Sequence, residues 1–594
     1  MRHCGPVEIL PLVFLLAACA PVEPVDSGGK APGVDSGTDS GVDSGGDTDP
    51  SDPRCPGGGS TGRAAPPLLA AAELLADTEP ASPIDGAAFG QDVDADDPRH
   101  AFNGRLAFRP TREERVIWHA EPWFTDAWLQ APLPDFDAEY VQCGRDLLPT
   151  TRGRVQTDNA YWDLILSPGR TWSNPADEGY TRVALPFALT PKYVNCVANG
   201  LLTFLHDGER TSQVRWQVTQ ETCHLLRFDA WGQAPATYTP TASSDTTIDA
   251  WVAELARRPE VRDFAELAVD HPEVDLDALD IELSLEHTSA RGLLVEGVLY
   301  LDRCRTRYGD DPFCEGMVLP SFSLAKTAYT SLAMAAMAQE FPVDPYPRTT
   351  GELLGTHGTW GDVSLEHLID MATGHYVYDV QSDPDVPGFY GSLDLEGRLD
   401  ATFALPYQRP PGEAVVYLTP NSQVAAAALN AHLVDVGSNE TDSFAYLVDR
   451  VLEPAGLSPE SSQSLRTWEE GGENNGTAFG GYGMWFTPHG ISALGAFLQR
   501  GGDGLLHPDR LAETLFRTED RGAAMSYFGY RYNNGMWGFP TPGCEVYAPI
   551  LFGVSGITVI VAPNGLVYFA FTDAQEYPVA NVLEQLDRLS PICP

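Results

Sequence analysis

The 594-residue sequence predicts an α+β protein in which an all-β segment comes first and a mixed segment of helices and strands follows. Three observations lead to this class. Between residues 68 and 240, apolar and polar residues alternate, as at Val214, Trp216 and Val218, and turn residues recur at short intervals. After Ser244 the apolar residues are spaced as on helices. Two apolar strands and a helical pattern end the chain.

Residues 68 to 244 are expected to form one sandwich-like β domain. The run from Leu201 to Leu205 leads into His206-Asp207-Gly208, which predicts a hairpin. The segment is rich in tryptophan. These side chains are expected in its core, and an aromatic sugar-binding face is the alternative. They are Trp118, Trp123, Trp128, Trp162, Trp172 and Trp231.

A buried helix is predicted to begin near Ser323, because Pro320 lies just before it and a run rich in Ala, Leu and Met follows. Ser323 and Lys326 are three residues apart, which places both side chains on one face of the helix. In this arrangement a hydroxyl can attack an acyl carbon while the amine takes its proton. The chain has only three lysines, and arginine, its main cation, cannot act as a base. The alternative is a surface lysine whose stem packs along the helix.

The mixed segment, residues 245 to 594, ends in a predicted sheet covered by a helix. Residues Ile557 to Val561 and Leu566 to Phe571 are predicted strands, joined by the tight turn Pro563-Asn564-Gly565. Apolar residues at helical spacing then predict a final helix packed on the sheet. These residues are Val579, Val582, Leu583, Leu586 and Leu589.

The N-terminus predicts export. Arg2 and His3 precede a short apolar run that ends at Ala18, so residues 1–18 are assigned to a signal peptide. Leu16-Ala17-Ala18-Cys19 resembles the lipobox of bacterial lipoproteins. This resemblance implies a lipid on Cys19 and attachment to the bacterial cell envelope, at the outer membrane and facing the periplasm or the surface. The alternative is an ordinary secretory signal followed by a coincidental cysteine.

Residues 19–67 are expected to be a disordered tether, because they are acidic, rich in glycine and nearly free of large apolar groups. Asp-Ser-Gly recurs there, and a calcium-binding repeat is the alternative. The whole chain has a formal net charge of −46, which argues against nucleic acid and anionic membrane surfaces as partners. Membrane contact is expected only through the lipid anchor.

Eight cysteines remain when Cys4 and Cys19 are set aside, and an even number in an exported protein predicts disulfides. Cys304 and Cys314 bracket a polar loop and are the pair expected to bond. The sequence has no Cys-x-x-Cys or His-x-x-x-His spacing of the kind that binds zinc. The sequence therefore predicts no metal and no cofactor.

Four further segments carry a family resemblance. They are Val363 to His375, Pro411 to Gln423, Val451 to Leu457 and Gly481 to Gly490. In order, they resemble the "LLTMTSG", "PG-x-x-F-x-Y-S-x-x-N", "I-x-x-PLGM" and "GGGLWMTPRDL" segments of the β-lactamase-related serine hydrolases, which include class C β-lactamases, DD-peptidases, esterases and aminohexanoate-oligomer hydrolases. With the Ser323 helix they follow the family's order. The resemblance implies an antiparallel sheet flanked by helices, with an all-helical subdomain.

The resemblance also implies roles for single residues. Ser323 would be the nucleophile, and Lys326 and Tyr417 would share the proton transfers, with the identity of the base left open. Thr419 and Asn421 would contact the substrate or Lys326, and the alternative for Asn421 is a turn residue that bonds local backbone. The oxyanion would be held by the backbone N–H of Ser323 and by one near Ile557, after Ser555 and Gly556.

One motif departs from the family. Lys-Thr-Gly or His-x-Gly is usual where this chain has Val554-Ser555-Gly556, so a serine takes the place of the cation. A hydroxyl supplies no net charge for a substrate carboxylate. We therefore expect hydrolysis of a less charged ester or amide, from a small-molecule or peptide-like acyl substrate. Arg531 is a candidate for a replacement cation. The alternative function is a non-catalytic surface lipoprotein that uses the fold for binding.

Overall fold

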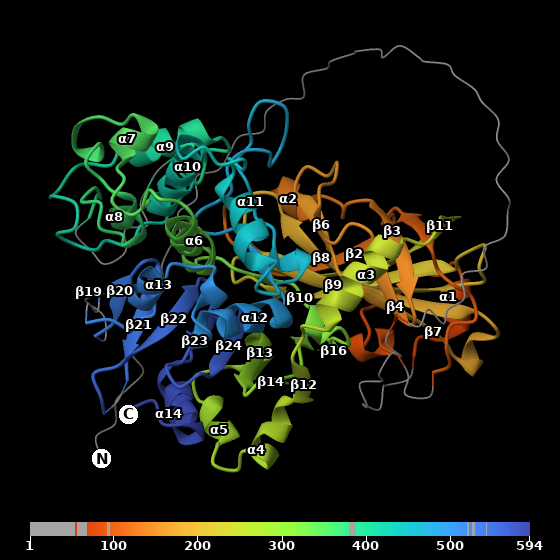
Figure 1. The fold of residues 1–594 in the computed structure, drawn as a ribbon. Coiled ribbons are helices and arrows are strands. Elements are labelled where there is room, and N and C mark those ends of the chain that lie inside the picture. Colours follow the sequence, from red (N-terminus) through yellow and green to blue (C-terminus); the bar gives the residue numbers. More distant parts are fainter. Residues whose placement is uncertain are drawn as a thin grey trace.

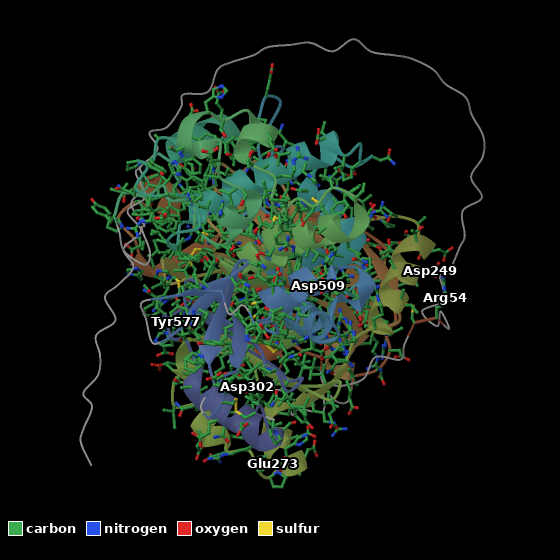
Figure 2. The ribbon with its side chains drawn as sticks, turned by 60° about the vertical axis from the view of Figure 1, so that its left-hand side comes forward. Arg54, Asp249, Glu273, Asp302, Asp509 and Tyr577 are labelled. Atoms are coloured by element: carbon green, nitrogen blue, oxygen red, sulfur yellow. A yellow bond between two sulfur atoms is a disulfide. The ribbon has the colours of Figure 1, made fainter. Side chains whose placement is uncertain are left out.

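The computed structural model describes residues 54–55, 68–91, 95–378, 386, 388–519, 522–525, 529–541 and 543–593. The predicted signal peptide, Cys19 and most of the predicted tether lie outside these residues. Two residues of the predicted tether are described, and both are fastened to the folded chain. Arg54 forms ion pairs with Asp245 at 2.7 Å and Asp249 at 2.9 Å (Figure 2). Cys55 forms a disulfide with Cys143.

The predicted α+β class is confirmed, because the described residues form two large sheets with helices around the second (Figure 1). Strands β1 to β11 build the first sheet. Their bounds are Gly104–Phe108, Glu113–Ala120, Phe136–Cys143, Asp146–Pro149, Gly153–Val155, Trp162–Leu166, Gly169–Ser173, Thr181–Pro191, Val197–His206, Gln213–Thr222 and Leu226–Pro240. We call residues 68–244 the β unit and residues 245–594 the mixed unit, with the boundary between them proposed at Ser244, which caps helix α3.

The first sheet closes on itself. In the described part of the chain, β1, β3, β4, β7, β8, β9, β10 and β11 each pair antiparallel with the next, and β11 pairs with β1. The all-β prediction is therefore confirmed, but the strands form a closed ring of pairings and the expected sandwich of two sheets is wrong. Closure is favoured because it leaves these strands without an open edge. The predicted hairpin is β9 and β10, with Gly208 at a φ of 94° in the turn.

Of the six tryptophans predicted for the core of the β unit, three are buried, two are partly buried against the core and one is exposed. Trp162, Trp172 and Trp231 are buried. Trp118 is the correction, because its side chain is 59% exposed on β2, where its indole N–H donates to Asp229 at 2.9 Å. Among the described strands, β2 pairs only with β11 and lies outside the ring, so its other edge is unpaired and most of its side chains are exposed or half-buried.

The second sheet has the strand order β12-β14-β13-β24-β23-β22-β21-β20-β19 among the described residues. All neighbouring strands are antiparallel except β12 and β14. The predicted pair of C-terminal strands is confirmed as β23 and β24. The bounds from β12 are Glu260–Asp263, Thr288–Val295, Val298–Leu301, Ala523–Ala524, Arg531–Asn533, Met536–Pro540, Tyr547–Gly553, Ile557–Val561 and Val567–Thr572, with β15 to β18 lying outside this sheet.

Helices lie on both faces of the second sheet. On one face, α14 buries Val582, Leu583 and Leu586 against the sheet, which confirms the predicted final helix. On the other face, α12 packs on β23 and β24, and the helices from α6 to α11 lie above it in Figure 1. From α1, the α-helices are Ala71–Leu75, Asp126–Gln130, Asp245–Leu255, Leu267–Asp270, Leu276–Leu279, Leu332–Glu340, Thr350–Leu354, Leu365–Ile369, Leu395–Phe403, Thr419–Asp435, Ser443–Leu447, Pro488–Gln499, Pro508–Thr514 and Ala580–Leu589. Within the described ranges, no helix has the length and apolar character needed to cross a membrane.

The predicted helix after Ser323 differs in detail from the prediction. Its first part, Lys326–Ser331, is a π-helix, and the α-helix α6 begins only at Leu332. The hydroxyls of Thr330 and Ser331 donate to the carbonyl of Lys326 at 2.6 and 3.0 Å, so side chains satisfy this carbonyl in the wider turn. Single π-turns of this kind occur often at functional sites.

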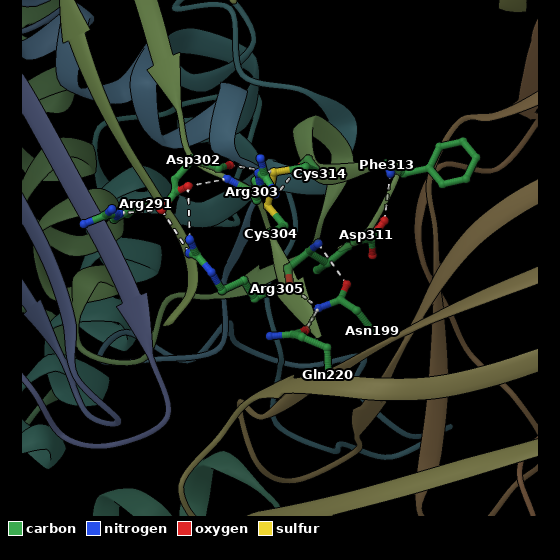
Figure 3. The surroundings of a disulfide bond; sticks show 11 residues. Asn199, Gln220, Arg291, Asp302, Arg303, Cys304, Arg305, Asp311, Phe313 and Cys314 are labelled. Atoms are coloured by element: carbon green, nitrogen blue, oxygen red, sulfur yellow. Dashed lines mark hydrogen bonds and ion pairs between the residues drawn. A yellow bond between two sulfur atoms is a disulfide. The ribbon is translucent and has the colours of Figure 1, made fainter. Parts of the chain in front are cut away.

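The eight cysteines other than Cys4 and Cys19 are all paired. The predicted bond between Cys304 and Cys314 is confirmed (Figure 3). The other pairs are Cys55 with Cys143, Cys196 with Cys223, and Cys544 with Cys593. These bonds fit a chain that folds in an oxidising compartment.

The β unit and the mixed unit share buried contacts. An apolar cluster joins Ile165, Ala188 and Val197 of the β unit to Val318, Leu465, Phe479 and Trp485 of the mixed unit. Beside it, the guanidinium of Arg152, between β4 and β5, donates two bonds of 2.8 Å to Glu460 and also pairs with Glu254. Side-chain exposure is 1% for Glu460, so its charge depends on this arginine.

We predict that Arg152→Met lowers the free energy of unfolding by about 3–5 kcal/mol, because it leaves a buried carboxylate without a partner. Urea denaturation at pH 7 measures this change. Arg109→Met is the matched control, because the ion pair of Arg109 with Asp135 is exposed and contributes little. Equal denaturation midpoints for the two variants would contradict the prediction.

Candidate active site

The turn that carries Ser323 is held between two strands. Just before it, β17 (Leu319–Pro320) pairs antiparallel with β18 (Trp485–Phe486). Ser321 continues this pairing, because its N–H donates to the carbonyl of Met484 at 2.9 Å. Phe322 then takes a φ of 40°, which is unusual for a residue with a side chain and turns the chain into the helix. Ser323 follows at the first turn and is half-buried, so its hydroxyl can be reached.

A close backbone approach fixes this turn against the second sheet. A Cβ atom built on Gly553, the last residue of β22, would lie 2.8 Å from the carbonyl oxygen of Ser321. Only glycine permits this approach without a shift of the backbone. The end of β22 and the start of β23 therefore lie directly beside the turn Ser321 to Ser323, called the nucleophile turn after the predicted role of Ser323.

The amine of Lys326 is buried among neutral groups. Its Nζ donates to Ser323 Oγ at 2.9 Å, Thr419 Oγ1 at 3.1 Å and the carbonyl oxygen of Gly481 at 3.2 Å. The residue is 1% exposed. Burial disfavours the ammonium form and lowers the pKa of Lys326 to about 7. At neutral pH a large fraction of this amine is therefore free to accept a proton.

Tyr417 lies beside the amine. Lys326 Nζ is 4.8 Å from the centroid of the Tyr417 ring. Burial raises the pKa of Tyr417, while the neighbouring Ser323 hydroxyl lowers it in part, and the net shift is upward. The phenol therefore keeps its proton at neutral pH. The structure thus brings Ser323, Lys326, Tyr417 and Thr419 together.

Asn421 is placed differently. It lies in the first turn of α10, fully buried, and its side-chain amide donates to Met371 Sδ at 3.8 Å and not to Lys326. Tyr390, which the sequence analysis does not identify, takes the place beside Thr419, whose hydroxyl lowers the otherwise raised pKa of Tyr390. No sequence motif pointed to Tyr390, because it lies in a turn outside the segments that resemble the family.

The third motif turns its serine toward the β unit. Ser555 is fully buried with a φ of 83°, and its Oγ lies 2.9 Å from His224 Nδ1. Burial lowers the pKa of His224 to about 4, so this imidazole is neutral at pH 7. The candidate cation Arg531 instead donates to Tyr547 and to the carbonyl of Gly522.

The residues after Ser555 lead into the sheet. Gly556 has a φ of 106°, and Ile557 begins β23 opposite Gly553. Burial raises the pKa of Tyr577 to about 12, and a hydrogen bond with the backbone of Gly556 lowers it in part. Because Ile557 pairs with Gly553, which contacts the nucleophile turn, the start of β23 lies next to that turn.

Two further residues of the site come from the β unit, and the sequence analysis missed both. Asn195 bonds the nucleophile turn and His224 bonds the third motif. Their only signal in the sequence is position, since each stands next to a cysteine of one disulfide, Cys196 with Cys223. Among the described residues, no group of three or more His, Cys, Asp or Glu side chains is placed to hold a metal ion.

No protein-family model matches the sequence, and no curated protein matches it. The chain is similar to a solved penicillin-binding protein homolog from Caulobacter crescentus, with 13% identity and a TM-score of 0.39 over 56% of this chain and 97% of that chain. It is also similar to EstCE1, a hydrolase with promiscuous acyltransferase activity, with 16% identity and a TM-score of 0.38 over 54% of this chain and 99% of that chain. A third similar chain is a D-amino acid amidase from Ochrobactrum anthropi, with 14% identity and a TM-score of 0.38 over 53% of this chain and 97% of that chain. At these TM-scores, we base the function on the geometry of the site alone.

We predict that the rate at which Ser323 reacts with a fluorophosphonate rises with pH, with an apparent pKa of about 7. Below this pH, Lys326 is protonated and cannot accept the serine proton, and above it the amine is free. Labelling rates measured between pH 5 and 9 test this. Lys326→Met is the control, because it removes the amine and should abolish this titration. A wild-type profile that is flat across this range would contradict the assignment.

Proposed function

We propose that the chain is a serine hydrolase that cleaves an ester or amide bond through an acyl-enzyme on Ser323. One observation carries this proposal. The amine of Lys326 lies 2.9 Å from Ser323 Oγ, and its other polar contacts are neutral oxygens. Burial of an ammonium without a carboxylate partner is unfavourable, so this environment favours the neutral amine. A neutral amine beside a serine hydroxyl can act as a base.

The proposed reaction begins with Lys326 as the base. Lys326 takes the proton of Ser323 as Oγ attacks the substrate carbonyl, and a tetrahedral oxyanion forms. Tyr417 gives its proton to the leaving oxygen or nitrogen and recovers one from the Lys326 ammonium. The acyl-enzyme is then hydrolysed by water, which passes its proton back along the same groups. Lysine is preferred to tyrosine as the base because burial lowers the pKa of Lys326 and raises that of Tyr417.

The oxyanion needs donors that are fixed before the reaction. We assign this role to the backbone N–H of Ser323 and to that of Ile557. Within the described residues, Ser323 N–H donates to no acceptor, whereas the N–H groups of Phe322, Leu324 and Ala325 do. Thr419 is assigned to hold the amine of Lys326. Ser555 and Gly556 are assigned to shape the start of β23, where the carbonyl of Ser555 accepts a hydrogen bond from Thr572 Oγ1. Asn421 is assigned to support Met371, because its side-chain amide donates to Met371 Sδ.

The substrate is proposed to lack a carboxylate next to the scissile bond. Among the described residues, the side chain of Ser555 contacts His224, whose imidazole is neutral at pH 7, and contacts no cation. We also propose that residues 19–67 tether the enzyme to the cell envelope through a lipid on Cys19. The four disulfides agree with export.

We predict that a fluorophosphonate probe labels the wild type at Ser323 and that Ser323→Ala removes the label. Mass spectrometry of the labelled peptide identifies the modified serine. Lys326→Arg should reduce the labelling rate at least about 100-fold, because a guanidinium keeps the charge but cannot act as a base. Absence of labelling in the wild type would favour the non-catalytic binding protein. Equal labelling of Ser323→Ala would place the nucleophile elsewhere.

We predict a preference for neutral acyl substrates. The p-nitrophenyl ester of a short neutral acid should be hydrolysed with a kcat/KM at least about 10-fold higher than that of the matched ester with a free carboxylate, because no charge-assisted hydrogen bond compensates for desolvation of the carboxylate. The comparison is made at pH 7, where His224 is neutral. Equal kcat/KM values, or a preference for the acidic ester, would show that another cation serves the site.

A further inference from the structure

Two residues with positive φ flank the proposed active site, and neither is glycine. Phe322, with φ 40°, precedes the nucleophile, and Ser555, with φ 83°, precedes the start of β23. Residues with side chains avoid this region unless surrounding contacts hold them there, and such residues gather at functional sites. Side chains of the β unit contribute to holding both residues.

Asn195 holds the nucleophile turn. It lies in the loop between β8 and β9 and is 1% exposed. Its Oδ1 accepts hydrogen bonds from Phe322 N–H at 2.7 Å, Ser321 Oγ at 3.0 Å and Gly483 N–H at 3.0 Å. Its Nδ2 donates to the carbonyl of Met484 at 3.0 Å. One amide side chain therefore joins the turn before Ser323 to the segment that precedes β18.

His224 holds the third motif. It lies in the loop between β10 and β11, and its backbone N–H lies 3.2 Å from Ser555 Oγ, with Nδ1 at 2.9 Å from the same oxygen. The carbonyl of Ser555 is held separately, by Gln575 N–H at 2.7 Å and Thr572 Oγ1 at 3.0 Å. The left-handed residue before the start of β23 is thus fixed on both sides.

A disulfide joins these two supports. Asn195 precedes Cys196, and His224 follows Cys223, and the two cysteines are bonded and buried. The loops β8–β9 and β10–β11 lie at the same end of the closed sheet, because consecutive antiparallel strands return every second loop to one end. The bond therefore sets the distance between the support of the nucleophile turn and the support of the third motif.

We propose that Asn195 is a positioning residue for the reaction, and that the Cys196–Cys223 loop pair of the β unit fixes the two oxyanion donors, at Ser323 and Ile557, relative to one another. The mixed unit alone is then an incomplete catalyst. This inference rests on the proposed function for its catalytic meaning, whereas the contacts that carry it are independent of any reaction.

Asn195→Ala tests the proposal, with Asn199→Ala as the matched control. Asn199 is also a buried asparagine of the β unit, and it bonds both backbone groups of Val318, at 2.9 Å to the carbonyl and 3.0 Å from the N–H, and the side chain of Gln220 (Figure 3). It therefore ties the same two units together without touching the nucleophile turn. Both variants are studied as full chains, at a temperature where circular dichroism shows each to be folded.

Two readouts are used. Site-resolved hydrogen exchange reports on the amides, and Asn195→Ala should speed exchange at Phe322 and Gly483, while Asn199→Ala speeds it at Val318. The fluorophosphonate labelling rate of Ser323 should fall about 100-fold in Asn195→Ala, and kcat for an ester should fall with it while KM stays within about threefold. Asn199→Ala should keep the wild-type rate. The double variant Cys196→Ser/Cys223→Ser should also lose kcat.

The outcomes separate this proposal from the proposed function. If the wild type is labelled and Asn195→Ala is labelled at the same rate, the positioning role is wrong while the hydrolase stands. If both asparagine variants lose activity in proportion to their loss of thermal stability, Asn195 is only a structural contact. If the wild type is not labelled, the proposed function fails, and unchanged exchange at Phe322 in Asn195→Ala would still overturn the support of the turn by Asn195.

Discussion

The arrangement of the groups around the site depends on the desolvation of one amine, that of Lys326. Lys326 is enclosed by the helix that carries it, by the first turn of α10 and by the backbone at Gly481, and each supplies an uncharged oxygen. A carboxylate in any of these places would stabilise the ammonium and so remove the proposed base. The chain has 83 acidic residues, so the neutral surroundings of Lys326 are a specific feature of the fold and not a result of composition.

The same constraint explains why the fold around the site is so closely joined. A buried amine can stay near pKa 7 only if water is kept from it and its partners cannot move away. The β unit contributes to this rigidity through shared apolar core, through the ion pairs of Arg152 and through Asn195 and His224. The β unit is therefore part of the site, because its loops contact both the turn before Ser323 and the third motif.

The sequence allowed prediction of those features that depend on local pattern. Alternation and helical spacing predicted the all-β segment, the strands β23 and β24, and α14, since each is set by which residues face the core. The spacing of Ser323 and Lys326 predicted their contact, and the family resemblance brought Tyr417 and Thr419 to them. Closure of the first sheet was not predictable, because it depends on pairing between β8 and β9 as members of a ring. Asn195 and His224 were missed because their partners lie more than a hundred residues away in sequence.

The disulfide of Cys55 with Cys143 changes the reach of the proposed tether. It fastens the chain to β3 and leaves only twelve residues, 56 to 67, before the expected start of the folded part, and Arg54 adds two ion pairs beside it. Twelve residues correspond to at most about 40 Å of extended chain. A lipid on Cys19 would therefore hold the enzyme closer to its membrane than the length of the acidic segment suggests. Any force on that segment would enter the molecule at the closed sheet and at α3, and would reach the site through the contacts between the two units.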